Sequence, residues 1–201
     1  MFESNQKRHL GDSTGRRRFL LEGGTALAGL GWLLSDLCQS VQAQPWPSSP
    51  LQQVTIVEFT DAGVRKGTIT VPVIQKSDAE WKKQLPAASF EVARHSDTER
   101  PFTGSLLNVH DKGVFRCICC DTASFDSATK FESGTGWPSF SAPIAKENIV
   151  ESQDTSFGVV RTAVSCRRCD AHLGHVFDDG PKPTGLRYCM NSVALRFAKA
   201  S

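Results

Sequence analysis

The sequence has almost no net charge, no long uninterrupted hydrophobic run and no internal repeat or low-complexity block. Its formal net charge of +2 is split evenly, with five basic and four acidic residues in 1–43 and eighteen basic and seventeen acidic residues in the remainder. A chain this close to neutral has no electrostatic attraction to nucleic acid or to an anionic membrane, so neither is an expected partner. With 39% hydrophobic and 22% charged residues, the composition is that of an ordinary globular domain.

The most apolar stretch, residues 19–37, is too interrupted to be a good membrane anchor. It contains two acidic residues and four glycines, whereas a spanning helix needs about 20 mostly apolar residues. Three arginines at 16–18 precede it, and the small residues at 41–43 resemble a cleavage site. We therefore expect a twin-arginine-type signal peptide over 1–43 and a periplasmic mature protein without a stable membrane span. An uncleaved anchor and a lipoprotein at Cys38 are less favoured alternatives.

The rest of the chain is predicted to be mainly β, with short helices near its start. Residues 44–76 form a Pro- and Ser-rich lead-in and then two β-rich runs, "VTIVEF" and "TITVPVI", which indicate a hairpin. Over 77–201 we expect one domain. Ser77 and Glu80 have the spacing of a capping box, so a helix should begin there and end at Pro86, with a second short helix over 87–94. Later strands are predicted in "GVFRCI", "SFGVVRTAVSC" and "NSVALRF", with a long functional loop, "TKFESGTGWPSFSAPI", between them.

Four of the seven cysteines form two C-x-x-C pairs, Cys117 with Cys120 and Cys166 with Cys169. Two such pairs in one domain are typical of a tetrahedral zinc site with four thiolate ligands. Four ligands leave no open position, so one structural Zn²⁺ is expected, joining two parts of antiparallel β-sheet. Two disulfides or a redox-active C-x-x-C are the alternatives, since an exported protein meets an oxidising compartment. Cys119 is placed outside the metal site, because its spacing from Cys117 is too short.

A further cysteine, Cys189, lies in "GLRYCMNSVALRF". If this run is one strand, alternation puts Arg187, Cys189 and Asn191 on the face that later carries Val193 and Leu195. A guanidinium near a thiol favours the reactive thiolate, and an amide at Asn191 can orient a water molecule. A buried, unreactive cysteine beside a salt-bridging arginine is the alternative.

Two more stretches bear on this choice. The segment "AHLGHVFDDG" supplies His172 and His175, while its aspartates read as turn residues. Histidine titrates near neutral pH and is a common general acid, although such a pair taken alone is more often structural or metal-binding. In "GTGWPSF", Trp137 lies on a glycine-bounded loop where it can form the wall of a pocket.

Taken together, "TERPFTG", "ESGTGWPSF", the two C-x-x-C pairs and "DAHLGHVFDDGPKPTGLRYCMNS" resemble the methionine sulfoxide reductase B family over about residues 77–197. The resemblance implies the fold of that family, with zinc-stapled antiparallel β-sheets and short N-terminal helices. It also implies reduction of the R epimer of methionine sulfoxide in proteins and peptides, without a redox cofactor.

The resemblance also implies roles for individual residues. Cys189 would be the nucleophile that becomes a sulfenic acid, with Arg187 lowering its pKa. His172 and His175 would donate a proton and hold water, and Asn191 would support them. The remaining assignments are the substrate methyl group against the ring of Trp137 and a scaffold zinc on Cys117, Cys120, Cys166 and Cys169.

One departure from the family concerns regeneration of the thiol. Family members commonly have a resolving cysteine where this chain has Thr135 or Ser96. Only Cys119 is then unassigned, and it lies inside a metal-binding turn. We therefore expect an external thiol or a thioredoxin-like reductant to attack the sulfenic acid directly.

Two other classes of function compete with this interpretation. A non-enzymatic zinc module that binds a ligand or a partner would not need Cys189, Arg187 and two histidines together. A thiol–disulfide oxidoreductase would carry one C-x-x-C at a helix start in a βαβ context, and the sequence shows none.

Overall fold

A computed structural model describes residues 52–201. The expected signal peptide over 1–43 and the first part of the lead-in, 44–51, lie outside the described residues, and the division expected at residue 76 stays a prediction. No helix within 52–201 is long and apolar enough to cross a membrane.

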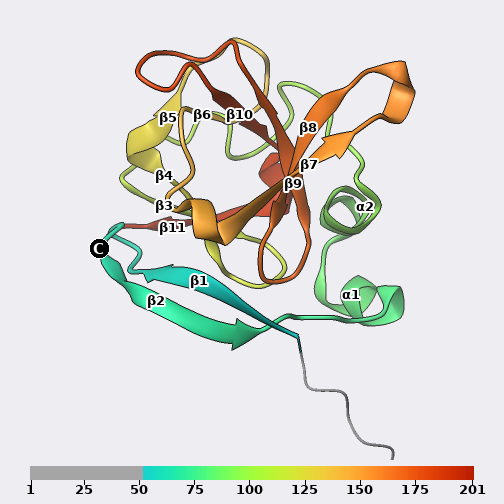
Figure 1. The fold of residues 1–201 in the computed structure, drawn as a ribbon. Coiled ribbons are helices and arrows are strands. Elements are labelled where there is room, and N and C mark those ends of the chain that lie inside the picture. The colour runs from blue at the N-terminus through green and yellow to red at the C-terminus, as the bar shows by residue number, and fades with distance from the viewer. Residues whose placement is uncertain (1–51) are drawn as a thin grey trace, which may run out of the picture. The chain divides into compact units, whose positions relative to one another are not determined.

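The predicted hairpin is present as strands β1 (Gln53–Phe59) and β2 (Arg65–Pro72), which pair antiparallel. It runs along one side of the domain (Figure 1). The buried side chain of Asn148 ties it down: its Oδ1 accepts from the Val57 amide at 2.7 Å, and its Nδ2 donates to the carbonyls of Val57 and Ala123 at 2.8 and 2.7 Å. Such a satisfied buried amide fixes how the hairpin sits on the domain.

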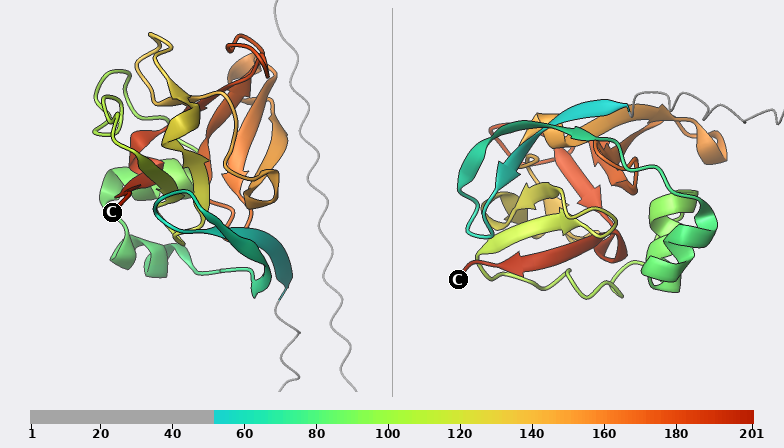
Figure 2. Two further views of the ribbon diagram at one scale, coloured as in Figure 1. Left: turned by 90° about the vertical axis from the view of Figure 1, so that its left-hand side faces the viewer. Right: turned by 90° about the horizontal axis from the view of Figure 1, so that it is seen from below.

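Both predicted helices are confirmed, and they lie beside one end of the hairpin (Figure 2). Helix α1 (Asp78–Gln84) begins with the capping box, in which Ser77 and Glu80 each accept a hydrogen bond from the other's backbone amide. Helix α2 (Ala87–His95) follows Pro86 and ends at Ser96 in the left-handed conformation. The local signals were sufficient here because caps act within a few residues.

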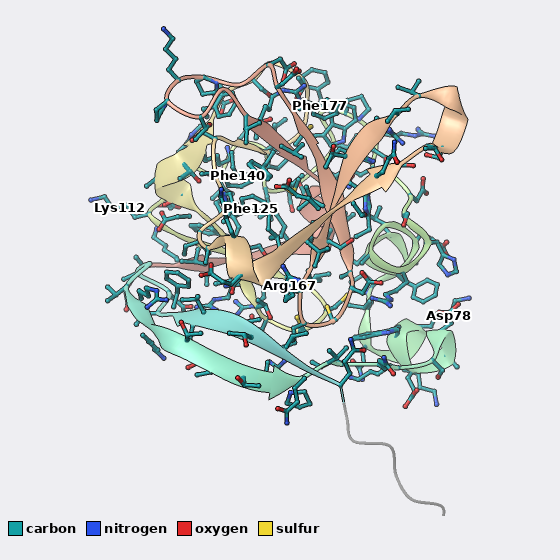
Figure 3. The ribbon with its side chains drawn as sticks, in the orientation of Figure 1. Asp78, Lys112, Phe125, Phe140, Arg167 and Phe177 are labelled. Carbon is teal, nitrogen blue, oxygen red and sulfur yellow. The ribbon has the colours of Figure 1, made fainter. Side chains whose placement is uncertain are left out.

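Two further antiparallel sheets form the body of the domain. A six-stranded sheet has the order β5-β6-β10-β9-β8-β7, and a three-stranded sheet has the order β11-β3-β4. The phenylalanines of β4 and β6, Phe125 and Phe140, stack between them with ring centroids 4.6 Å apart (Figure 3). The strand bounds are β3 Gly113–Cys117, β4 Ala123–Asp126, β5 Lys130–Phe131, β6 Ser139–Phe140, β7 Ile149–Asp154, β8 Arg161–Cys166, β9 His172–Phe177, β10 Arg187–Met190 and β11 Leu195–Lys199.

The run "GLRYCMNSVALRF" does not form the single strand that the alternation argument assumed, and the strand predicted in "NSVALRF" begins only at Leu195. Strand β10 ends at Met190, a short 3-10 helix covers Ser192–Ala194, and β11 then joins the other sheet. The break occurs because the amide and side chain of Asn191 both bond the carbonyl of Leu173, so the chain turns away from the sheet. The nucleophile candidate therefore lies at the crossing between the two sheets.

Strand β9 contains a bulge that matters for the site. Val164 of β8 pairs with Gly174, but Ser165 pairs with His172, so Leu173 is an extra residue on β9. An extra residue reverses the alternation of faces. His172 and His175, which three-residue spacing alone would put on opposite faces of a strand, consequently share one face.

Gly174 makes a close approach between β9 and β10. A Cβ added there would lie 2.1 Å from the carbonyl oxygen of Cys189 and 2.9 Å from Met190 Cα. Only glycine permits this contact between the two backbones.

Candidate active site and metal centre

The four predicted metal ligands come together in the structure. The sulfur atoms of Cys117, Cys120, Cys166 and Cys169 all lie within 4.8 Å of one another. Each pair occupies the same kind of turn at the end of a strand: the amide of Asp121 bonds the Cys117 carbonyl and that of Asp170 bonds the Cys166 carbonyl, both at 2.9 Å. Each of these aspartates has a positive φ, 66° and 56°, which closes the turn.

The geometry of this cluster fits a metal ion better than disulfides. The Sγ atoms of Cys117 and Cys169 are 3.6 Å apart, and those of Cys120 and Cys166 are 3.4 Å apart. A disulfide needs about 2.05 Å, whereas sulfurs about 2.3 Å from a tetrahedral zinc are separated by about 3.8 Å. Cys119 is not part of the cluster, as expected from its spacing.

Burial and crowding among these thiols also favour a cation. The surrounding thiols, together with burial, raise the pKa of Cys117 well above the usual range. Four sulfurs this close cannot all carry charge unless a positive ion lies between them. The donor set therefore suits a structural Zn²⁺.

Cys189 stands in a row of side chains that crosses one face of the six-stranded sheet. Register pairs Cys189 with Ser139 of β6 and with His175 of β9, and the row continues through Ala163 to Ser152. The neighbouring row carries Arg187 opposite Phe177. The sheet therefore sets the spacing between thiol and imidazole by backbone pairing.

The thiol of Cys189 opens into a small pocket of about 110 Å³. Four of the predicted site residues line it, but His172 and Arg187 do not. The lining residues are Thr98, Trp137, Arg161, Gly174, His175, Phe177, Cys189 and Asn191.

The pKa of Cys189 differs from the sequence expectation. Burial raises the pKa of its thiol, and this outweighs the opposing effects of the Thr135 hydroxyl, the charge of Arg187 and the Ser139 hydroxyl. The Oγ1 of Thr135 lies 3.9 Å from Sγ of Cys189. Arginine therefore acts in the expected direction but does not bring the thiol below its ordinary value.

Asp179 explains why Arg187 lowers the pKa of Cys189 only slightly. Arg187 donates from Nε and Nη2 to the two carboxylate oxygens of Asp179, each at 2.8 Å, and its guanidinium lies 4.4 Å from the ring centre of Phe177. Asp179 was predicted only as a turn residue. Its carboxylate neutralises part of the charge that would otherwise act on Cys189.

His175 is held by two residues that the sequence analysis missed. Its Nε2 lies 2.7 Å from Oδ2 of Asp154, and Nη2 of Arg161 reaches the same oxygen at 2.7 Å. Hydrogen bonds from the backbone and side chain of Ser156, and then from His175, hold the pKa of Asp154 far below its usual range. This charged carboxylate can orient the imidazole of His175 through their hydrogen bond.

His172 lies behind His175, with their ring centroids 5.1 Å apart. Its Nε2 is buried and has no hydrogen-bond partner in the structure. Burial is the main cause that lowers the pKa of His172 to about 4, followed by the neighbouring His175. His172 is therefore neutral at physiological pH.

This lowered pKa predicts an acid-sensitive stability. Between the ordinary pKa of 6.5 and about 4 the unfolded chain binds a proton that the folded chain does not. His172 should therefore cost the protein about 2 kcal/mol of its free energy of unfolding as the pH falls from 7 to 5. Urea titrations at both pH values should show this loss in the wild type and a smaller one in His172→Gln. Equal losses would contradict the assignment.

Glu99 is a third residue that sequence reasoning missed. Its carboxylate accepts from the amides of Ser192 and Val193 at 2.7 and 3.0 Å, its own amide donates to Oδ1 of Asn191 at 3.1 Å, and its carbonyl accepts from Nε1 of Trp137 at 3.1 Å. It thereby fixes the tryptophan ring and the turn after β10 together. Glu99 lies in the motif "TERPFTG", which supported the family resemblance, but the motif indicated no role for the residue.

Comparison with known proteins gives consistent matches. The profile of the SelR domain matches residues 85–199. The protein named peptide methionine sulfoxide reductase MsrB from Pseudomonas savastanoi pv. phaseolicola is 56% identical over 122 residues, which cover 61% of this chain and 93% of that protein. Proteins of the same name from Hahella chejuensis and Herminiimonas arsenicoxydans are 54% and 51% identical, over 63% and 61% of this chain and 91% and 89% of their own.

Proposed function

The chain belongs to the methionine sulfoxide reductase B family, defined by its SelR domain, and from this premise we propose that it reduces methionine (R)-sulfoxide in peptides through the thiolate of Cys189. The observation that carries the proposal is the pocket in which Cys189, His175, Asn191 and Trp137 meet. An oxidoreductase of this kind needs one accessible thiol, one proton donor and one apolar wall, and this pocket supplies all three.

The chemistry follows from the residues around the sulfur. The Cys189 thiolate attacks the sulfoxide sulfur, the sulfoxide oxygen and one proton pass to the cysteine, and methionine leaves as the thioether. The cysteine is oxidised to a sulfenic acid by the two electrons that reduce the substrate. Because burial raises the pKa of Cys189, the thiol is mostly protonated at neutral pH, and Arg187 with the nearby hydroxyls supports the thiolate as it forms.

His175 is the better candidate for the proton donor. It lines the pocket, and its hydrogen bond to the charged Asp154 orients the ring. His172 is neutral and outside the pocket lining, so we assign it a supporting contact behind His175. Asn191 is held through its own amide group by Glu99 and Leu173, so its part is to shape the pocket.

The aromatic ring of Trp137 accounts for the selection of one epimer of the substrate. Methyl and sulfur groups pack favourably on aromatic faces, and the ring is fixed by its hydrogen bond to Glu99. When the methyl group packs on Trp137 and the oxygen points toward His175, only one of the two epimers presents its sulfur to Cys189 for attack.

The four clustered cysteines would hold one zinc ion, which has no vacant position for substrate and so stabilises the scaffold. This role leaves catalysis to the pocket.

Separated epimers test the proposal directly. With dithiothreitol as reductant, the enzyme should turn over a peptide containing methionine (R)-sulfoxide and leave the S epimer unchanged. Turnover would be followed by chromatography of the reduced peptide. Equal rates on both epimers would contradict the pocket assignment, and no turnover on either would contradict the activity.

We also propose that regeneration uses one protein cysteine. Thr135 has its Oγ1 3.9 Å from Sγ of Cys189, and it has no thiol. Cys119 would have to leave the turn formed by two metal ligands, a site worth on the order of 10 kcal/mol in small zinc domains. One equivalent of R-sulfoxide without reductant should therefore leave Cys189 as a sulfenic acid that a dione reagent traps, with zinc retained.

Thr135→Cys is the matched control for that measurement. A thiol at this position should close a disulfide with Cys189 and abolish trapping, since the present hydroxyl is already 3.9 Å from the sulfur. Mass spectrometry that finds a Cys119–Cys189 disulfide in the wild type would contradict the one-cysteine cycle.

For localisation we propose export to the periplasm by the twin-arginine-type leader over 1–43, which rests on the sequence alone. Cell fractionation after replacement of the arginines at 16–18 by lysine would check it.

A further inference from the structure

Three hydroxyl side chains meet beside the sulfur of Cys189 without lining the pocket. Ser139 is paired with Cys189 in the register between β6 and β10 and is 1% exposed, while Ser133 and Thr135 lie on the loop between β5 and β6. Gly134 has a φ of 73°, in the left-handed region that tight turns use, so the side chains on either side of it can converge. None of the three hydroxyl residues is among those that line the pocket.

The hydroxyls form a continuous hydrogen-bonded chain that begins at the sulfur. Oγ1 of Thr135 lies 3.9 Å from Sγ of Cys189 and 2.8 Å from Oγ of Ser133. Oγ of Ser133 lies 2.7 Å from Oγ of Ser139, which donates to the carbonyl of Trp137 at 3.2 Å. The chain therefore ends at an oxygen that can only accept.

This acceptor fixes the direction of every hydroxyl proton while Cys189 is a thiol. A hydroxyl donates only one hydrogen bond. Ser139 gives its proton to the carbonyl, so the bond between Ser133 and Ser139 must be donated by Ser133. By the same reasoning Thr135 donates to Ser133, and the thiol donates to Thr135. Every donor in the chain then has one acceptor.

Loss of the thiol proton requires the opposite order. A thiolate has no proton to donate and attracts a donor strongly, because hydrogen bonds to a charged group are roughly twice as strong as neutral ones. When Thr135 turns its proton toward the sulfur, Ser133 donates to Thr135 and Ser139 donates to Ser133. Each hydroxyl only rotates about its C–O bond, and in the free protein the thiol proton passes to water. The one bond given up is the 3.2 Å contact with the carbonyl of Trp137.

The charged groups around this sulfur are already paired with carboxylates. Arg187, on the same strand, is paired with Asp179. His175 and Arg161 line the pocket from β9 and β8 and share one carboxylate oxygen of β7. Burial raises the pKa of the thiol more than any other cause, and the Thr135 hydroxyl is the strongest of the causes that lower it. Neutral hydroxyls therefore have a large part in supporting the thiolate.

We propose that Ser133 is a positioning residue for Cys189: because it bonds both Thr135 and Ser139, it lets the hydroxyl chain reverse when the thiol ionises and so stabilises the thiolate. Ser133 acts through Thr135, whose hydroxyl bonds the sulfur. Hydrogen bonds in a chain polarise one another, so a donor that also accepts a bond is a stronger donor. The inference deepens the proposed function, since it concerns the same sulfur, but its test does not depend on turnover.

The ionisation of Cys189 can be followed without substrate. The full-length protein is alkylated with iodoacetamide at pH values from about 6 to 10, and the rate follows the thiolate fraction. Mass spectrometry of the peptide that contains Cys189 separates its rate from that of Cys119. Thr135→Val keeps the shape of the side chain without its hydroxyl and should raise the midpoint by about 1 pH unit, with a roughly tenfold lower rate near neutral pH. Ser133→Ala should raise the midpoint by about 0.5 pH unit and lower that rate about threefold.

The double variant distinguishes a chain from two independent contacts. Because Ser133 acts through Thr135, Ser133→Ala combined with Thr135→Val should shift the midpoint no further than Thr135→Val alone.

Ser141→Ala is the matched control. Ser141 follows β6 directly, is half-buried like Ser133 and donates to the carbonyl of Thr129 at 3.3 Å. The same substitution there removes a hydrogen bond that is not connected to Cys189, so it should leave the midpoint unaltered. Zinc content and urea titration confirm that each variant is folded.

The alternative outcomes separate the claims. An unaltered midpoint in Ser133→Ala overturns the proposal, and so does a double variant whose shift is the sum of the two single shifts. An equal shift in Ser141→Ala also overturns it, since the effect would then follow from any lost hydrogen bond in this region. A protein that is alkylated as expected but turns over no sulfoxide overturns the proposed function and leaves the hydroxyl chain standing.

Discussion

Cys189→Ser should abolish turnover while the domain stays folded. A serine hydroxyl is a far weaker nucleophile than a thiolate and cannot form a sulfenic acid, so kcat/KM should fall by roughly 10³-fold or more. The hydrogen bond between the thiol and Thr135 is long, at 3.9 Å, and serine keeps a hydroxyl in the same place, so the free energy of unfolding should change by about 1 kcal/mol or less. Turnover on the R-sulfoxide peptide and urea titration measure the two quantities.

The same substitution at Cys119 provides the control. Cys119 is half-buried and outside both the metal cluster and the pocket, so Cys119→Ser should keep activity with dithiothreitol. Normal turnover by Cys189→Ser would show that another residue is the nucleophile.

Removing one metal ligand should have the opposite pattern, with loss of structure rather than of a reactive group. Cys117→Ser or Cys169→Ser leaves three thiolates around the ion, and both positions are buried. Since a structural zinc site contributes on the order of 10 kcal/mol in small domains, we expect less than one zinc per chain and a large drop in the urea midpoint. Activity should fall with the folded fraction.

The expected drop has a structural reason. Cys117 ends β3 of the three-stranded sheet and Cys166 ends β8 of the six-stranded sheet, so a metal ion held by this cluster would join the two sheets that form the body of the domain. A strong chelator added to the wild type should lower its stability in the same way. A variant that lost zinc but unfolded at the wild-type urea concentration would contradict the scaffold role.

Local patterns in the sequence predicted much of this fold. The capping box at Ser77, the hairpin and the two C-x-x-C turns depend on residues a few positions apart, and all are present. Alternation also correctly put Arg187 and Cys189 on one face of β10. It failed beyond Asn191, because the turn there is set by bonds to Leu173 on another strand.

The missed residues share one physical property. Asp154 contacts His175 across 21 positions, and Glu99 contacts the turn after β10 across more than 90. Charged residues in turns have many uses, and nothing local distinguishes one that reaches a distant site. The bulge at Leu173, which brings His172 and His175 to one face, is likewise a result of strand pairing.

The contact between Gly174 and the backbone of β10 makes the position of Cys189 depend on a single residue. Side chains that line a pocket can be exchanged one at a time, and each exchange alters specificity by degrees. Gly174 cannot be replaced in this gradual way, because the Cβ of any other residue would clash with the carbonyl oxygen of Cys189. The place of the sulfur is therefore set by the main chain at Gly174, while the side chains around the pocket set which substrates fit.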